Sequence, residues 1–351
     1  MRQSRQNIEQ ELRRRICDGT YPPGSRLPLR RDLLRELKPS PLTLQRAMDR
    51  LAEQGFIHAR GPQGTFVATH LPNRGTIALV FPVASQRAAL ANRFWATLLR
   101  VAEATHADDA FSFRPYFLPD QNLDSQEHQR LCADLADGGL AGLFFTSAPF
   151  FLAGSPLLKA ACPRVCIASN QAAIVDQFGF SCLGMNTDSA YEAVFRRLRS
   201  AGRTRIGFLT DPRVDTCPWL PLLKELGLST RPEWWLTIPA SAAICARPVA
   251  RLLCAWPEPQ GVDALMITDD NLVPFATAGV QDAGPRKGAG LLIAAHANFP
   301  APTHAAVPCL RFGTDVAELV RVAGEEIGYL AAGGAARVRM VNQVFRDGGV
   351  S

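Results

Sequence analysis

Short apolar segments alternate with amphipathic segments along most of the chain, from residue 76 to residue 332. An apolar segment of about four to eight residues without a polar face predicts a strand buried on both sides. The amphipathic segments between them predict helices that cover both faces of a parallel sheet. This stretch is too long for one small sheet with its helices, so the pattern predicts an α/β region with two lobes.

The strands and helices of this region can be placed by residue range. Strands are expected at 76–82, 113–118, 140–146, 164–168, 182–185, 205–209, 235–238, 264–267 and 290–294. Helices are expected at 94–106, 125–137, 189–201, 218–226, 246–255, 272–283 and 316–332. Because neighbouring strands are expected to be parallel, their carboxyl ends should meet at one edge of each sheet, where open α/β sheets bind ligands.

Positive charge is concentrated ahead of this region. The chain has 38 Lys and Arg and 32 Asp and Glu, which give a net charge of +6. Residues 1–74 hold 14 basic and 7 acidic residues and carry +7, which leaves 24 basic and 25 acidic residues and a charge of −1 for the rest. This division is typical of a module that binds a polyanion, and a merely solvated surface does not require it.

The first 70 residues show the pattern of three helices and a hairpin. Helices are expected at 3–18, 29–37 and 41–55, and strands at 56–60 and 65–69. Ser40 is a suitable N-cap for the third helix, and Pro41 fits its first position because a missing N–H costs nothing there. Gly55 fits the C-cap of this helix. The order of elements predicts a winged helix-turn-helix.

The third of these helices has one buried stripe and one polar face. Leu44, Ala47, Met48 and Leu51 recur at helical spacing and leave the other face to residues that form hydrogen bonds or carry charge. A helix held in this way can lie in the major groove of DNA with its first turns against base edges. The candidate DNA-binding residues are Arg30, Arg31, Ser40, Thr43, Gln45, Arg46, Arg60, Gln63 and Gly64. The alternative is a three-helix interaction domain whose polar face is solvated.

The stretch GTYPPGSRLPLRRDLLRELKPSPLTLQRAMDRLAEQGFIHARGPQGTFVA resembles the DNA-binding domain of the GntR family. The matching features are Pro23-Gly24, Leu27-Pro28, Arg31 before an acid and a leucine, the helix exit LAEQGFI from Leu51, and the wing from Gly61 to Val67. The resemblance covers residues 5–70 and implies binding to double-stranded operator DNA, with a contact carried over to Arg31. Pro41 and Gln45 stand where the family usually has arginine, so the resemblance does not supply the operator sequence.

Two motifs of the α/β region resemble the effector-binding core of the LacI family, which is related to periplasmic sugar-binding proteins. They are MNTDSAYEAVFRRLRSAGRTRIGFLTDP at 185–212 and DALMITDDN at 263–271. The resemblance covers about residues 75–350 and implies two lobes that close on a sugar or another small polar molecule. It also implies that Asp270, with Asp269 beside it, holds ligand hydroxyls, a task that suits carboxylates.

Further candidates for the effector site lie at the ends of predicted strands, where a crevice between two lobes would meet them. The candidate effector-binding residues of this kind are Phe81, Ser85, Ser147, Asn170, Asp269, Asp270 and Asn298. LacI-like cores usually carry arginine at the position of Thr216 and glycine at that of Trp219. Arg213 is expected to substitute for the arginine, and Trp219 to stack on a face of the ligand. Each polar candidate has a loop or helix-cap role as its alternative, and an atypical effector, or none, stays open.

No motif of an enzyme or a metal site is found. GxGxxG after a strand, GxxxxGK[ST], HExxH and GxSxG are missing, and the six histidines lack metal spacing. The nine cysteines include no CxxC pair, so we expect buried thiols, no metal and no cofactor. No segment approaches the roughly 18 apolar residues of a membrane helix, and the polar N-terminus lacks a secretory pattern, so we expect a cytoplasmic protein with no membrane partner.

These patterns predict a winged helix-turn-helix domain at 1–70, a linker at 71–75, and a two-lobed LacI-like domain for effector binding and dimerisation at 76–351. The predicted function is that of a DNA-binding transcriptional regulator, a ligand-responsive repressor. We expect a homodimer because two-fold operators require one. Two alternatives stay open: a small-molecule binding or transport receptor with an accessory head, and a DNA-binding regulator whose core no longer senses a ligand.

Overall fold

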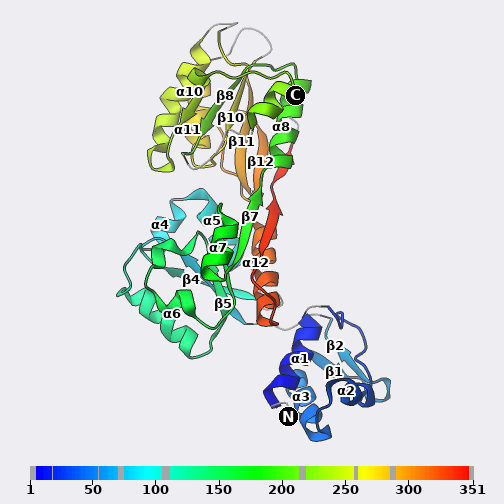
Figure 1. Ribbon diagram of the computed structural model, residues 1–351. Coiled ribbons are helices and arrows are strands. Elements are labelled where there is room, and N and C mark those ends of the chain that lie inside the picture. Colours follow the sequence, from blue (N-terminus) through cyan, green and yellow to red (C-terminus); the bar gives the residue numbers. More distant parts are fainter. Residues whose placement is uncertain are drawn as a thin grey trace. The chain divides into compact units, whose positions relative to one another are not determined.

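The computed structural model describes residues 5–17, 19–53, 55–69, 75–104, 111–212, 219–256, 260–284 and 290–347. Of the linker predicted at 71–75, only Gly75 is among them, and Arg213 and Thr216 lie outside them. The described residues form a small helical region at the N-terminus and two largely parallel sheets with helices (Figure 1). The predicted fold class is confirmed.

The N-terminal region contains three helices and one antiparallel hairpin. Its elements are α1 (Arg5–Cys17), α2 (Arg30–Leu37), α3 (Pro41–Glu53), β1 (Ile57–Ala59) and β2 (Thr65–Val67). Leu12, Leu33, Leu51 and Val67 come from four of these elements and are completely buried in one core. The apolar residues of α1 and α3 recur at helical spacing, so each helix has one side that packs against this core.

The chain divides into two compact units, and each contains a six-stranded sheet. The first unit comprises Met1–Gln86, Leu99–Gly184 and Val320–Arg339, and the second comprises Arg87–Leu98, Met185–Leu319 and Met340–Ser351. The first sheet has the order β13-β7-β6-β5-β3-β4, and β3 to β7 pair in parallel. Its strands are β3 (Thr76–Phe81), β4 (Ser112–Phe117), β5 (Leu140–Phe145), β6 (Arg164–Ile167), β7 (Ser181–Asn186) and β13 (Val338–Asn342).

Helices accompany the first sheet. They are α6 (Gln126–Ala136), α7 (Gln171–Phe178) and α12 (Val316–Ala331), together with the second half of α5 (Arg93–Glu103). The first half of α5 and nearly all of α4 (Gln86–Leu90) belong to the second unit. Helix α12 approaches β5 closely at Gly142, where an added Cβ would lie 2.8 Å from a methyl carbon of Ile327. A side chain at this position would therefore displace the helix or the strand.

The second sheet has the order β14-β12-β11-β10-β8-β9. Its strands are β8 (Ile206–Thr210), β9 (Trp235–Thr237), β10 (Ala264–Ile267), β11 (Leu292–Phe299), β12 (Leu310–Asp315) and β14 (Val344–Arg346), and its helices are α8 (Asp188–Ser200), α9 (Trp219–Glu225), α10 (Ala246–Ala255) and α11 (Val273–Asp282). Along β10, Ala264 and Met266 belong to the core formed with α8 and α9, whereas Leu265 and Ile267 belong to the core formed with α10 and α11. This alternation explains why the strand is apolar throughout: both of its faces are covered (Figure 1).

The sequence analysis missed several elements of the α/β region. They are α4, α7, β12, β13 and β14. Strand β12 contains Arg311 and Gly313, and β13 contains Arg339, so neither reads as an apolar run. Five short 3-10 helices complete the described structure, at Gly61–Gln63, Pro149–Leu152, Pro156–Lys159, Pro232–Trp234 and Ala240–Cys245.

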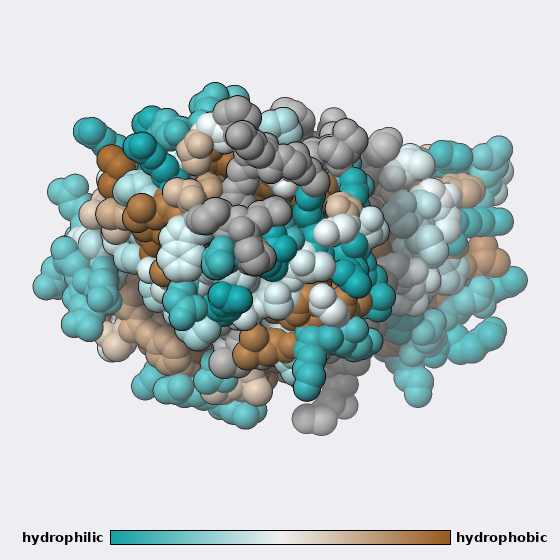
Figure 2. Space-filling model, turned by 90° about the horizontal axis from the view of Figure 1, so that it is seen from above, coloured by the Kyte–Doolittle hydropathy of each residue, from teal (hydrophilic) through white to brown (hydrophobic). Residues whose placement is uncertain are grey.

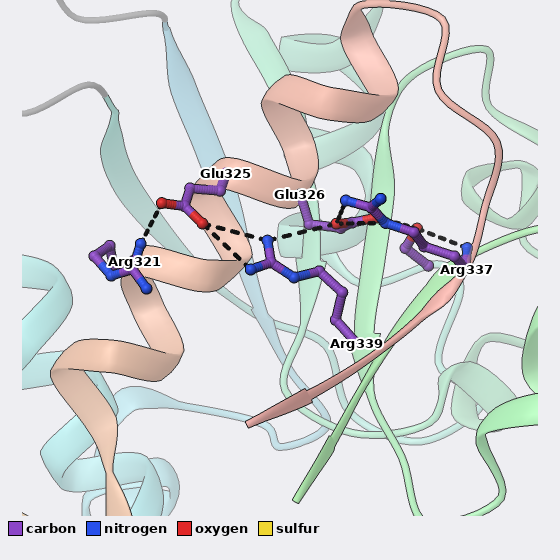
Figure 3. Close-up of polar contacts among 6 residues, drawn as sticks. Arg321, Glu325, Glu326, Arg337 and Arg339 are labelled. Carbon is purple, nitrogen blue, oxygen red and sulfur yellow. Dashed lines mark hydrogen bonds and ion pairs between the residues drawn. The ribbon is translucent and has the colours of Figure 1, made fainter. Parts of the chain in front are cut away.

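A buried carboxylate joins α12 to the strands of the first unit (Figure 3). Glu326 on α12 has a completely buried side chain, and its Oε1 accepts a hydrogen bond from Ser181 Oγ at 2.8 Å. Arg337 donates from Nε to Oε1 (3.1 Å) and from Nη2 to Oε2 (2.9 Å). The carboxylate is therefore paired with a charge and hydrogen-bonded, as a buried charge must be.

Hydrophobic residues on the face shown in Figure 2 form separate patches among hydrophilic ones. Within the described ranges, no helix combines the length and the apolar character needed to cross a membrane.

Candidate functional site

The first turn of α3 is fixed by Ser40. Its Oγ accepts a hydrogen bond from the Thr43 backbone N–H at 3.1 Å and lies 2.7 Å from Thr43 Oγ1. This is the N-cap arrangement that the sequence predicts, and it satisfies a backbone donor at the start of the helix. Leu44 and Leu51 bury the opposite side of α3, so its first turns present polar side chains outward.

Three arginines at the starts of α2 and α3 are available to a polyanion. Arg30, Arg31 and Arg46 are exposed, and the Arg31 side chain is 76% exposed with only a long contact to Asp32, at 3.8 Å. Gln45 is half-buried, and its Nε2 donates to Asp49 Oδ1 at 2.6 Å. A base contact by Gln45 would therefore replace an existing hydrogen bond. The arginines would lose at most the long contact of Arg31 to Asp32 on binding DNA.

The wing carries one arginine in a defined position. The Arg60 guanidinium lies over the Phe66 ring at 4.8 Å, and Arg60 Nε donates to His58 Nε2 at 3.0 Å. Gly64 has a φ of +102°, and a Cβ there would lie 2.8 Å from Arg26 Nε, so this position requires glycine. Gln63 is exposed beside it.

In the second unit, two predicted effector residues meet at the carboxyl ends of neighbouring parallel strands. Asp270 follows β10 and Asn298 lies near the end of β11, and each is 2% exposed. Asn298 Nδ2 donates to Asp270 Oδ2 at 3.0 Å. Asp270 Oδ1 and Asn298 Oδ1 are both shielded from solvent and have no hydrogen-bond partner among the described residues. Asp269, half-buried, accepts hydrogen bonds from the backbone and side chain of Asn271, both at 2.7 Å.

Three more polar residues extend this group. His296 lies on β11, and Gln343 Nε2 donates to Thr314 Oγ1 and lies near His296 Nε2, each at 3.4 Å. Burial lowers the pKa of His296, and the charges of Asp270 and Asp269 oppose this shift only in part, so the imidazole is neutral at pH 7. Thr314 and Gln343 were not predicted because β12, β13 and β14 were not recognised as strands.

Acidification is expected to destabilise the second unit through His296. Because the folded pKa lies below the ordinary value of 6.5, the unfolded chain binds the proton first as the pH falls below about 6.5. Folding stability should then fall by up to about 1.4 kcal/mol per pH unit until the folded imidazole also titrates. Urea denaturation of the wild type and of His296→Gln between about pH 7.5 and pH 5 measures this, and an equal pH dependence in both would contradict it.

The first unit holds the remaining polar candidates. Ser85, Ser147 and Asn170 follow β3, β5 and β6, which are neighbours in the sheet, so they lie at one edge of it. Ser85 and Asn170 are exposed and Ser147 is half-buried. Asn170 is the N-cap residue of α7, but its side chain makes no capping hydrogen bond. Their roles in ligand binding stay predictions.

Phe81 and Trp219 correct the sequence analysis. Phe81 is completely buried at the end of β3 and stacks on Phe117, with ring centroids 5.5 Å apart. Trp219 is 6% exposed at the start of α9, where its ring lies 4.3 Å from Tyr191 and 6.3 Å from Trp235. Both aromatic side chains belong to hydrophobic cores, so neither is placed to stack on a ligand. Arg213, the expected substitute for the family's arginine, lies outside the described residues.

Comparison with known families identifies the N-terminal region. The family of bacterial regulatory proteins named gntR matches residues 4–67. These residues form a GntR-family helix-turn-helix domain. A sequence comparison with curated proteins finds no match.

Solved structures match most of the chain. The transcriptional regulator CelR in complex with cellobiose is 16% identical, with 88% of this chain and 90% of that chain covered and a TM-score of 0.55. A LacI-family regulator from Lactobacillus casei with bound glucose is 16% identical (77% and 98% covered, TM-score 0.54), and one from Chloroflexus aggregans is 15% identical (77% and 96%, TM-score 0.55). These likenesses show that the two sheets have the fold of LacI-family regulators. The family and the neighbours are transcriptional regulators and not enzymes, as predicted.

Proposed function

We propose that this DNA-binding transcriptional regulator is a repressor that releases its operator when a sugar or a similar small polar molecule binds the second unit. The observation that carries the ligand site is the pair of buried oxygens, Asp270 Oδ1 and Asn298 Oδ1, because buried polar groups normally have partners. A ligand that donates hydrogen bonds would satisfy them. The cellobiose and glucose bound to two structural neighbours support a sugar-like ligand.

On the DNA side, the exposed arginines of the GntR-family domain would hold phosphates and base edges. Arg30, Arg31 and Arg46 supply the positive charge, Ser40, Thr43 and Gln45 lie on the outward face of α3, and Arg60, Gln63 and Gly64 form the wing. Hydroxyl, amide and guanidinium groups are those that read base edges in the major groove. The protein would act in the cytoplasm as a homodimer, so that two GntR-family domains bind two half-sites.

A selection of random-sequence DNA duplexes by the full-length protein tests the DNA-binding part of this function. We expect the enriched duplexes to share a motif with two-fold symmetry, since each half-site would contact one GntR-family domain. Light scattering of the protein–duplex complex should give two protein chains per duplex. Failure to enrich any motif over the starting pool, or one protein chain per selected duplex, would contradict the proposal.

A further inference from the structure

Asp270 Oδ1 and Asn298 Oδ1 in the second unit are unpaired hydrogen-bond acceptors. Asn298 directs its amide nitrogen at the Asp270 carboxylate, which accepts hydrogen bonds only, so the orientation of this amide is fixed. Its other atom, Oδ1, is therefore a carbonyl acceptor. Asp270 Oδ1 is an acceptor as well, and both atoms are shielded from solvent. These two oxygens lack donors, and the neighbouring His296 Nδ1 is a further buried atom without a partner among the described residues.

Among the described residues, which do not include Arg213, no cation pairs with the charge of Asp270. Its single side-chain hydrogen bond comes from a neutral amide. His296 is the nearest basic side chain of the group, but burial lowers its pKa and leaves it neutral. A carboxylate that is 2% exposed and accepts one hydrogen bond costs folding free energy unless a cation approaches it.

Two other buried carboxylates show the contrast. Asp263 in the second unit accepts hydrogen bonds from the backbone N–H groups of Thr204 and Arg205 and lies 3.4 Å from Arg205 Nη1. Glu326 in the first unit accepts hydrogen bonds from Ser181 and from two nitrogens of Arg337. The chain thus supplies a cation where a buried carboxylate is part of the fold. Asp270, at the edge of a sheet where ligands bind in such folds, has none from the described residues.

From this contrast we propose that the ligand of the second unit carries a protonated amine that binds Asp270 Oδ1 and Asn298 Oδ1, as in an amino sugar or another amino polyol. This inference rests on the proposed function, since it names the chemical class of the ligand for the same site. An ammonium group provides three N–H donors and one positive charge, and so supplies both missing features. A neutral sugar supplies hydroxyl donors but leaves the carboxylate unneutralised.

Matched ligand pairs test this inference. The probes are glucosamine with glucose, galactosamine with galactose, and mannosamine with mannose, measured by thermal shift and titration calorimetry at about pH 6.5, where the amines are protonated. In at least one pair the amino sugar should bind the full-length protein at least about tenfold more tightly than its neutral partner, because the hydrogen bond to Asp270 is charge-assisted. Asp270→Asn should abolish this preference. Asp282→Asn, on the exposed surface of α11, is the control that should keep it.

A second measurement needs no ligand. If the Asp270 carboxylate lacks a cation in the free protein, Asp270→Asn removes a buried charge and keeps the acceptor for Asn298, so it should raise the melting temperature by about 3 °C. A structural role for Asp270 predicts a fall instead. A melting temperature of Asp270→Asn below that of Asp282→Asn would therefore overturn the inference.

The outcomes distinguish the two proposals. If the neutral sugars bind as tightly as the amino sugars or more tightly, the inference of an amine ligand is wrong, while the proposed sugar-responsive regulator is not contradicted. If no sugar of any pair binds, the inference of an amine ligand is wrong, and the result also counts against a sugar-like ligand. The DNA selection still tests operator binding independently.

Discussion

Replacing Glu326 with alanine is expected to lower the free energy of unfolding by about 3–5 kcal/mol. The side chain is completely buried, and its removal would leave the Arg337 guanidinium and the Ser181 hydroxyl without their acceptor. The Glu326 carboxylate is also the largest cause of the raised pKa of Arg337, so the two charges stabilise one another. Chemical denaturation of the full-length variant measures the loss.

Glu325 is the matched control for this prediction. It is the preceding residue of α12, its side chain is 47% exposed, and it pairs with Arg321 and, at 3.3 Å, with Arg339 (Figure 3). Exposed ion pairs contribute about 1 kcal/mol or less, so Glu325→Ala should cost far less than Glu326→Ala. Glu326→Gln keeps an acceptor for Ser181 but loses the charge, and should fall between the two. Equal losses for the two alanine variants would show that Glu326 contributes no more than a surface pair.

Neutralising Arg31 and Arg46 together should lower the affinity for the selected duplex about 100-fold. Both side chains are exposed, so the GntR-family domain keeps its fold when they are truncated. If both contact phosphates, the slope of log affinity against log salt should become less steep by about two. Fluorescence anisotropy over a range of salt concentrations measures both quantities, and circular dichroism verifies the fold.

The control is a double variant with the same loss of charge elsewhere. Arg196 and Arg247 are exposed in the second unit and pair with Glu192 and Asp282. Their replacement by alanine should leave the affinity for DNA within about twofold, because they lie outside the GntR-family domain that is proposed to hold the duplex. If the Arg31/Arg46 variant binds like this control, these residues do not contact DNA.

Part of the fold could be predicted because local pattern and tertiary burial agree. Strand β10 and helix α10 were predicted with the bounds that the structure has, since β10 is apolar on both faces and α10 has one apolar stripe. Helix α7 was missed because its apolar residues follow one another and show no helical spacing. Strand β12 was missed because its register with β11, and not its own composition, makes it a strand.

The candidate site, like the fold, could be predicted only in part. Asp270 and Asn298 could be placed together from the sequence because the carboxyl ends of neighbouring parallel strands converge. The sequence could not show that Trp219 faces the core, since its direction depends on how α9 rotates against Tyr191 and Trp235. Nor could it show the unpaired oxygens, which depend on the position of the Asn298 amide relative to Asp270.

The most direct test of a ligand-controlled regulator measures one coupling in both directions. The affinity for the selected duplex is measured with and without the sugar or amino sugar that most stabilises the protein, and the affinity for that ligand is measured with and without the duplex. A regulator that works as proposed should lose at least about fivefold in each affinity, and by the same factor, because coupling between two sites is reciprocal. An affinity for the duplex that stays unchanged at saturating ligand would contradict the proposal.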